Sequence, residues 1–132
     1  MRCITLYRPW ASWVVAGWKT IETRGHDRFR SLVGQRIAIH AGKVRDPQAV
    51  LLARRWLQTE RCAGTAPHAG VAGAVIGTVF VRSYRWLAPS DEQEAMCPCD
   101  GSRFGLFLCE PEVLKTPLYL PGHQGIWEVE LP

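Results

Sequence analysis

The chain has 132 residues, of which 47% are hydrophobic and 21% are charged. This length suits one domain with a core of its own, and the composition excludes disordered, collagen-like and strongly charged chains. No apolar run approaches the roughly 18 residues that a membrane-spanning helix needs, and the first residues lack the apolar stretch of a signal peptide. We therefore expect a single domain over residues 1–132, cytoplasmic and without membrane contact.

The net charge of +4 is divided unevenly along the chain. Residues 1–61 contain 12 Lys and Arg against 4 Asp and Glu, a balance of +8, whereas residues 62–132 contain 4 against 8, a balance of −4. Thirteen of the 16 basic residues are arginines, whose planar guanidinium binds phosphates and base edges and stacks on rings. The asymmetry indicates either a polyanionic partner or, more commonly, solvated faces or two halves of opposite charge that attract each other.

The five cysteines form an odd number, which favours free thiols over a secreted disulfide framework. Only one residue separates Cys97 from Cys99, whereas zinc ligands are usually separated by roughly two to four residues, and no second ligand pair follows. We expect neither a metal nor a cofactor.

Periodicity predicts the elements of the first third of the chain. In order, they are a strand over 2–7, a short helix over 10–17, extended or turning chain over 19–24, a basic loop over 25–31 and a strand over 36–41. Pro9 suits the first turn of the helix and Gly17 suits its end. A second helix should begin at Asp46, whose carboxylate can cap free amides, and run to about residue 57 or 58.

The rest of the chain reads mostly as strands. Residues 60–73, rich in glycine and alanine, predict a mobile connection, and residues 74–86 predict a central strand with a bulge or close approach at Gly77. Ser90 and Gln93 predict the capping box of a short helix. Two further strands are predicted over 104–108 and 126–131, the second with Trp127, Val129 and Leu131 inward. This order predicts an α+β fold whose strands curl into a small β-barrel, and not a doubly wound parallel sheet.

Residues 17–24 (GWKTIETR) gather several groups capable of chemistry in one segment. Lys19, Glu22 and Arg24 alternate there with the hydroxyls of Thr20 and Thr23. Such crowding can shift the pKa of a lysine or form an anion site. In a regular strand Lys19 and Glu22 would point to opposite faces, so their joint use requires a turn or bulge. The alternative is an ion pair on a strand edge with little energetic effect.

Together with residues 6–12, this segment resembles the opening of the ASCH (activating signal cointegrator homology) domain, whose signature is G-x-K-x-x-E-x-R. Every fixed position of the signature is met. The resemblance continues, in order, at residues 36–41, 75–79, 117–118 and 122–129, and so covers nearly the whole chain. It implies a PUA-like fold (pseudouridine synthase and archaeosine transglycosylase): a small β-barrel flanked by short helices, with a cleft beside the first helix, in a monomeric or weakly associating protein.

The resemblance also implies a function, because members of this family are thought to bind RNA or nucleotides in that cleft. The expected ligand is RNA, a single-stranded nucleic acid or a modified nucleoside, and its expected contacts are Pro9, Trp10, Lys19, Glu22, Arg24, His26, Arg28, Arg30 and His40. The basic loop would hold phosphates, and a tryptophan would stack on a base. We expect the far wall of the cleft within residues 60–73.

An enzymatic alternative rests on a branch of the family that resembles an N4-acetylcytidine amidohydrolase, with a lysine, a threonine three residues later and a distant glutamate. Lys19 matches, but Glu22 occupies the place of the threonine; Thr20 and Thr23 lie one residue to either side of the expected positions. Glu92 and Glu94 are candidates for the distant acid. Glu22 could instead act as general base for a water, with Lys19 stabilising the leaving group or an oxyanion. Ribonuclease activity and protein interaction are the remaining alternatives that the resemblance offers.

Overall fold

The computed structural model describes residues 1–49, 51, 54–56 and 65–132. In this part of the chain six strands form one mixed sheet in the order β2-β5-β4-β3-β1-β6. The strands are β1 (Arg2–Arg8), β2 (Ile21–Arg24), β3 (Arg36–Arg45), β4 (Ala74–Trp86), β5 (Phe104–Tyr119) and β6 (Trp127–Glu128). The helices whose bounds lie within the described residues are α1 (Trp10–Val15) and α3 (Glu92–Ala95), together with the short 3-10 helices η1 (Arg30–Leu32) and η3 (Pro89–Asp91). None of the described helices is long and apolar enough to cross a membrane.

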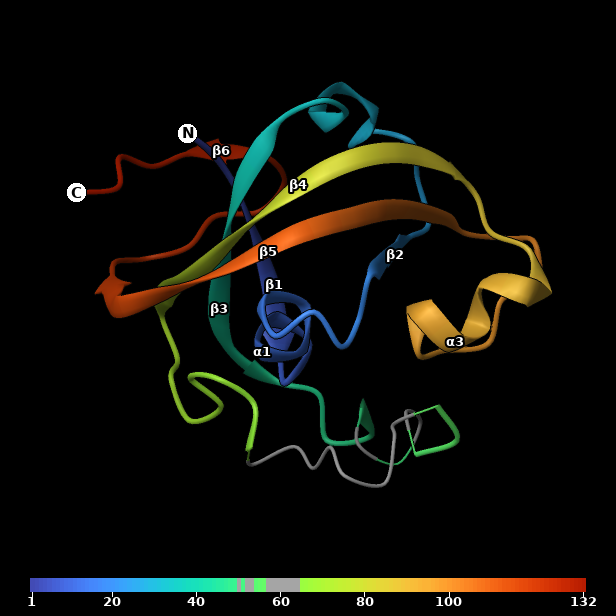
Figure 1. Cartoon of the computed structure of the whole chain (residues 1–132), viewed down its shortest axis with the longest axis horizontal. Coiled ribbons are helices and arrows are strands. Elements are labelled where there is room, and N and C mark those ends of the chain that lie inside the picture. Colours follow the sequence, from blue (N-terminus) through green and yellow to red (C-terminus); the bar gives the residue numbers. More distant parts are fainter. Residues whose placement is uncertain (50, 52–53, 57–64) are drawn as a thin grey trace.

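The predicted α+β class is confirmed, but the sheet is not closed into a barrel. β1 and β3 are parallel, and every other neighbouring pair is antiparallel. The long strands β4 and β5 bend across the molecule (Figure 1), so the sheet is strongly curved. Its two edges are β2 and β6, which have 4 and 2 residues, too few to join the ends of the sheet by a ladder of hydrogen bonds.

The strand predicted over residues 74–86 is β4, with the same bounds. β4 lies between β3 and β5, as its two apolar faces predict. Gly77 is at a close approach: a Cβ atom there would lie 2.5 Å from the carbonyl oxygen of Glu112 and 2.7 Å from Cγ1 of Val15. The register of β4 against β5 also shifts between Val75 and Gly77. The prediction of a bulge or close approach is thus confirmed.

Helix α1 packs its apolar face against the sheet and brings the signature segment into place. Trp13, Val14 and Val15 are buried, and the helix contacts β1, β3, β4 and β5. Gly17 follows the helix with a φ of +78°, a conformation that glycine adopts without strain. The predicted helix and its closing glycine are confirmed, and the chain turns there toward Lys19.

The predicted capping box of Ser90 and Gln93 is wrong. Asp91 caps this segment instead, because its carboxylate accepts a hydrogen bond from the Ala88 amide at 2.7 Å and binds the guanidinium of Arg85 at 3.0 and 3.1 Å. Gln93 donates to the carbonyl of Trp56. Arg85, six residues before Asp91, forms an ion pair with its carboxylate, and this gives the aspartate an advantage that the Ser90–Gln93 spacing does not include.

Three strands differ in length from the predictions. β3 continues to Arg45, and β5 continues to Tyr119 although it contains Pro111 and Pro117. Glu110, with a φ of +49°, and the register shifts against β4 accommodate the irregular ladder around the first proline. β6 is shorter than predicted because its partner β1 begins at Arg2, which leaves the last residues without a strand to pair with.

The helix predicted from Asp46 and the connection predicted over 60–73 lie partly outside the described residues. Within them, Asp46 accepts a hydrogen bond from the Gln48 amide at 3.0 Å, as expected of a capping carboxylate.

Candidate functional site

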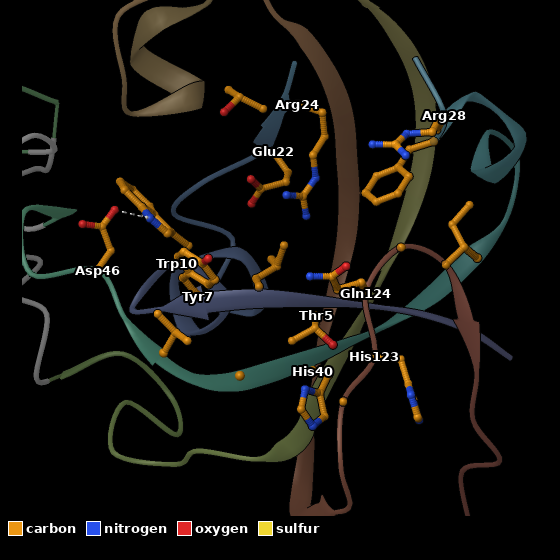
Figure 2. A pocket seen from close by; sticks show the side chains of 18 of the residues that line it. Thr5, Tyr7, Trp10, Glu22, Arg24, Arg28, His40, Asp46, His123 and Gln124 are labelled. Carbon is orange, nitrogen blue, oxygen red and sulfur yellow. Dashed lines mark hydrogen bonds between the residues drawn. The ribbon is translucent and has the colours of Figure 1, made fainter. Parts of the chain in front are cut away.

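A cleft of about 1310 Å³ opens between β2, the basic loop and the segment 121–126. Figure 2 shows its side chains coming from separate parts of the chain, with Glu22 and Arg24 on one side and His40, His123 and Gln124 on the other. Its lining contains five cationic side chains, Lys19, Arg24, Arg28, Lys43 and Arg103, and two carboxylates, Glu22 and Asp46. Cationic side chains thus outnumber carboxylates in this lining.

Lys19 lies in the short stretch between α1 and β2, which begins at Ile21. Lys19 and Glu22 thus do not share one regular strand, and both line the cleft. The Lys19 side chain is 3% exposed and donates a hydrogen bond to the carbonyl of Ala95. Burial lowers the pKa of Lys19, an effect that the nearby Glu22 opposes. The turn that the joint use of both residues requires is present.

Glu22 presents a buried carboxylate oxygen without a partner. The residue is 7% exposed, and its Oε2 atom accepts no hydrogen bond from the described part of the chain. None of the described ion pairs includes Glu22. Buried polar atoms in folded proteins are nearly always paired, with protein or with water, so this oxygen is an acceptor available to a bound molecule.

Arg24 and the basic loop form the wall next to Glu22. The guanidinium of Arg24 lies 4.9 Å from the ring centroid of Phe29, and its buried Nε atom has no hydrogen-bond partner among the described residues. His26 accepts a hydrogen bond from the Arg28 amide at 3.2 Å, which leaves the Arg28 side chain exposed at the mouth. Burial and the charges of Arg28 and Arg24 lower the pKa of His26. This wall has donors but few acceptors, which suits an anion.

The opposite wall is the segment 121–126, which packs on His40. His40 is 2% exposed, and its Nε2 atom donates to the carbonyl of Leu120 at 2.9 Å. Its buried Nδ1 atom forms no hydrogen bond with the part of the chain that the structure describes. Burial lowers the pKa of His40, so the neutral ring presents Nδ1 as a second acceptor. Trp127 borders the ring edge to face and donates from Nε1 to the hydroxyl of Thr5 at 3.2 Å.

Aromatic side chains complete the mouth of the cleft. Trp10 donates from Nε1 to Asp46 at 3.3 Å, the bond drawn in Figure 2, and the Lys19 ammonium lies 4.9 Å from the centroid of its ring. Tyr7, also part of the lining, is 56% exposed. An exposed tyrosine ring beside a basic wall is a surface on which a base can stack.

The structure places eight of the eleven residues named from the sequence in the cleft lining: Trp10, Lys19, Glu22, Thr23, Arg24, His26, Arg28 and His40. Three lie outside it. Pro9 is buried at the start of α1, Arg30 lies against Tyr84, and Thr20 donates a hydrogen bond to Glu94 at 3.2 Å beside a separate pocket.

The candidates for a distant catalytic acid also lie outside the cleft lining. Glu94 binds Thr20, and Glu92 accepts a hydrogen bond from the amide of Cys99 at 2.8 Å. Cys97 does line the cleft, while burial raises the pKa of Cys99 to about 11 and keeps that thiol protonated. Among the described residues, no group of three or more His, Cys, Asp and Glu side chains is arranged to hold a metal.

Several lining residues were not expected from the sequence. The far wall was predicted within residues 60–73; of the described part of that range only Gly73 lines the cleft, and the wall is formed by 121–126. Lys43 and Arg103 add charge from β3 and from the loop before β5. Their contribution depends on pairing between distant strands, so no local pattern indicates it.

Comparison with known proteins gives similarity at the level of structure. No family model matches the chain, and no curated protein matches its sequence. The crystal structure of ASCH from Zymomonas mobilis is similar, with a TM-score of 0.60 and 14% identity over 98% of this chain and 87% of that chain. Two point mutants of that protein give TM-scores of 0.61 and 0.62 at 15% and 14% identity, again over 98% of this chain and over 87% and 89% of theirs. At this identity what is shared is the fold.

Proposed function

The chain has the ASCH-like fold. We propose that it binds RNA or another single-stranded nucleic acid, with one nucleotide bound in the cleft. The observation that carries the proposal is the lining itself: five cationic side chains line the same space as a buried carboxylate whose Oε2 atom accepts no hydrogen bond from the described residues. The cations suit phosphate, and the carboxylate suits a base edge.

The charge of the lining supports a polyanionic ligand. Arg24, Arg28 and Lys43 all line the cleft, so a phosphate backbone that crosses it meets several cations. Each phosphate that a cation neutralises releases counterions, which favours binding and makes it dependent on salt. The front half of the chain, which supplies four of the five cations, is the half with the balance of +8.

Glu22 supports recognition of a base. A carboxylate accepts hydrogen bonds from the exocyclic amine of cytosine, and the unpartnered Oε2 gains such a bond without losing another. A buried acceptor that is satisfied only by the ligand also rejects ligands without a donor at that point. The cleft volume of about 1310 Å³ exceeds the roughly 300–1,000 Å³ of ordinary small-molecule sites, which leaves room for more than a free nucleoside.

A second candidate function is hydrolysis of an N-acyl group on a cytidine derivative or of an RNA phosphodiester. It is favoured by Glu22, Lys19 and Thr23 sharing the cleft. In this case the Glu22 carboxylate removes a proton from a water, and the Lys19 ammonium stabilises the developing negative charge. Thr20 has no part in it, since its hydroxyl is bound to Glu94 beside another pocket.

The variant Glu22→Gln tests both functions, because it keeps the shape of the side chain and removes its charge. Binding is measured by fluorescence anisotropy with a labelled ten-nucleotide RNA, and turnover with N4-acetylcytidine and the same RNA. For a binding protein we expect a several-fold loss of affinity and no turnover by the wild type. For a hydrolase the rate should fall roughly a hundredfold or more with affinity nearly unchanged.

Glu130→Gln is the matched control, because Glu130 is an exposed glutamate outside the cleft. It should leave affinity and turnover as they are in the wild type. Absence of binding of the wild type to any single-stranded RNA or DNA would overturn the proposed binding function. An equal loss of affinity in Glu22→Gln and Glu130→Gln would show that Glu22 has no specific part in binding.

A further inference from the structure

A stack of three aromatic rings lies next to the cleft and ends in solvent. Phe104 stacks on Tyr84 at 5.4 Å between centroids and on Trp86 at 3.9 Å. Tyr84 and Phe104 are buried, whereas Trp86 is 56% exposed. One face of the Trp86 indole thus rests on Phe104 and much of the remaining ring is open to solvent. An exposed tryptophan held flat by buried rings is a rigid surface for stacking.

The stack is continuous with the cleft through the sheet. Arg24 of β2 pairs with Phe104 of β5, and Phe104 pairs with Trp86 of β4. Directly paired residues of antiparallel strands project from the same face of a sheet. Since neighbouring strands are about 4.8 Å apart, the Cα atoms of Arg24 and Trp86 are separated by about 10 Å. Arg24 belongs to the cleft lining, so the exposed indole lies two strands away from this side of the site.

The basic loop connects the two places with positive charge. Arg28 lines the cleft, and Arg30 lies on the stack, with its guanidinium 5.3 Å from the Tyr84 ring centroid and 5.8 Å from that of Phe104. The hydroxyl of Tyr84 donates to the carbonyl of His26, which ties the loop to the stack. Arg30 was expected at the nucleic-acid site from the sequence, and its place beside the rings explains its absence from the cleft lining.

We propose that Trp86 is a second base-stacking position, which holds a nucleotide flanking the one in the cleft, with Arg30 on the other two rings of the stack available for phosphate. This inference rests on the proposed function and extends it from one nucleotide in the cleft to at least two consecutive nucleotides of a single strand. Base stacking on an aromatic side chain combined with a cationic track is how single strands are held without sequence preference.

The test compares variants of Trp86 in binding to a labelled ten-nucleotide RNA and, by competition, to a mononucleotide, which has no flanking base. Trp86→Ala should weaken binding of the RNA about tenfold and leave the mononucleotide nearly unaffected. Trp86→Phe, which keeps an aromatic ring, should retain most of the affinity, whereas Trp86→Leu, which keeps only apolar volume, should not. Tyr119→Ala is the matched control, since Tyr119 is 66% exposed at the far end of β5.

The result that would overturn the inference is an unchanged affinity of Trp86→Ala for the ten-nucleotide RNA, or a rescue by Leu equal to that by Phe. If Arg24→Gln abolishes binding in the same assay while Trp86→Ala does not, the cleft retains its proposed function and the second position is wrong. Absence of wild-type binding to the ten-nucleotide RNA overturns both. A change of oligomeric state in Trp86→Ala with unchanged RNA affinity assigns the ring to self-association and also overturns the inference.

Discussion

Glu22 and Lys19 are the two residues of the cleft whose burial calls for a physical reason. An unpartnered carboxylate oxygen and a lysine ammonium both lose hydration when they are buried, and each such loss costs stability unless partners replace the water. Lys19 recovers part of it from the Ala95 carbonyl, while the Oε2 atom of Glu22 has no such partner in the described chain. Sites that bind ligands commonly keep such groups, because a ligand completes their hydrogen bonds.

The buried Lys19 predicts a pH dependence of stability. Burial lowers its pKa in the folded state below the ordinary value of 10.5, which applies to the unfolded chain. Between those two values the unfolded chain binds more protons than the folded chain, so the free energy of unfolding rises with pH in this window. Lys19→Met removes the titrating group. Below this window the variant should be more stable than the wild type, and the difference between their free energies of unfolding should shrink as the pH approaches about 10.5.

Urea unfolding of the wild type and Lys19→Met at a series of pH values between about 8 and 10.5 measures this difference directly. Other titrating groups cancel because both chains contain them. A difference that stays constant over the series, or that grows with pH, would show that Lys19 is not held with a lowered pKa.

At the scale of elements, α1, a turn and β2 follow one another within a few residues, and this order brings both Lys19 and Glu22 of the signature segment to the cleft. The periodicity of the first helix and its closing glycine could be predicted from the sequence, and so could the turn that Lys19 and Glu22 need. The far wall could not, because segment 121–126 reaches the cleft only by packing on His40, and no local pattern encodes that contact. The continuation of β5 through Pro111 could not be predicted either, because the bulges that accommodate the proline arise from pairing with β4 and not from a local pattern.

The close approach at Gly77 gives a prediction about how α1 is held against the sheet. In Gly77→Ala the new methyl group would meet the Glu112 carbonyl oxygen at 2.5 Å and Val15 of α1 at 2.7 Å, so backbone or helix must move. We expect a loss of about 1–3 kcal/mol in the free energy of unfolding, measured by urea denaturation.

Gly70→Ala provides the control, because a Cβ atom at Gly70 has no neighbour within 4 Å. Its free energy of unfolding should differ from that of the wild type by less than about 1 kcal/mol. If Gly77→Ala proved as stable as Gly70→Ala, the packing of α1 on β4 would be looser than described above.

At the scale of the whole molecule, the fold and the charge distribution lead to the same site. The α+β class and the ASCH-like fold were predictable because the signature and its flanking strands appear in order along the chain. The open form of the sheet was not, since closure depends on the lengths of β2 and β6 and not on the number of strands. The basic front half supplies most of the cations of the cleft, although charge counts alone could not show that they line one space.

Nucleic-acid binding in the cleft is tested most directly by the salt dependence of RNA binding. The measurement compares the wild type, Arg28→Gln and the control Arg82→Gln. Arg28 lies exposed in the cleft lining, and Arg82 is an exposed arginine of β4 outside it. If the cleft holds the phosphate backbone, log K should fall linearly with log salt concentration, and Arg28→Gln should bind more weakly with a slope smaller by about 0.7–0.9. Arg82→Gln should match the wild type. Affinity that is independent of salt, or equal slopes in Arg28→Gln and the wild type, would contradict nucleic-acid binding in this cleft.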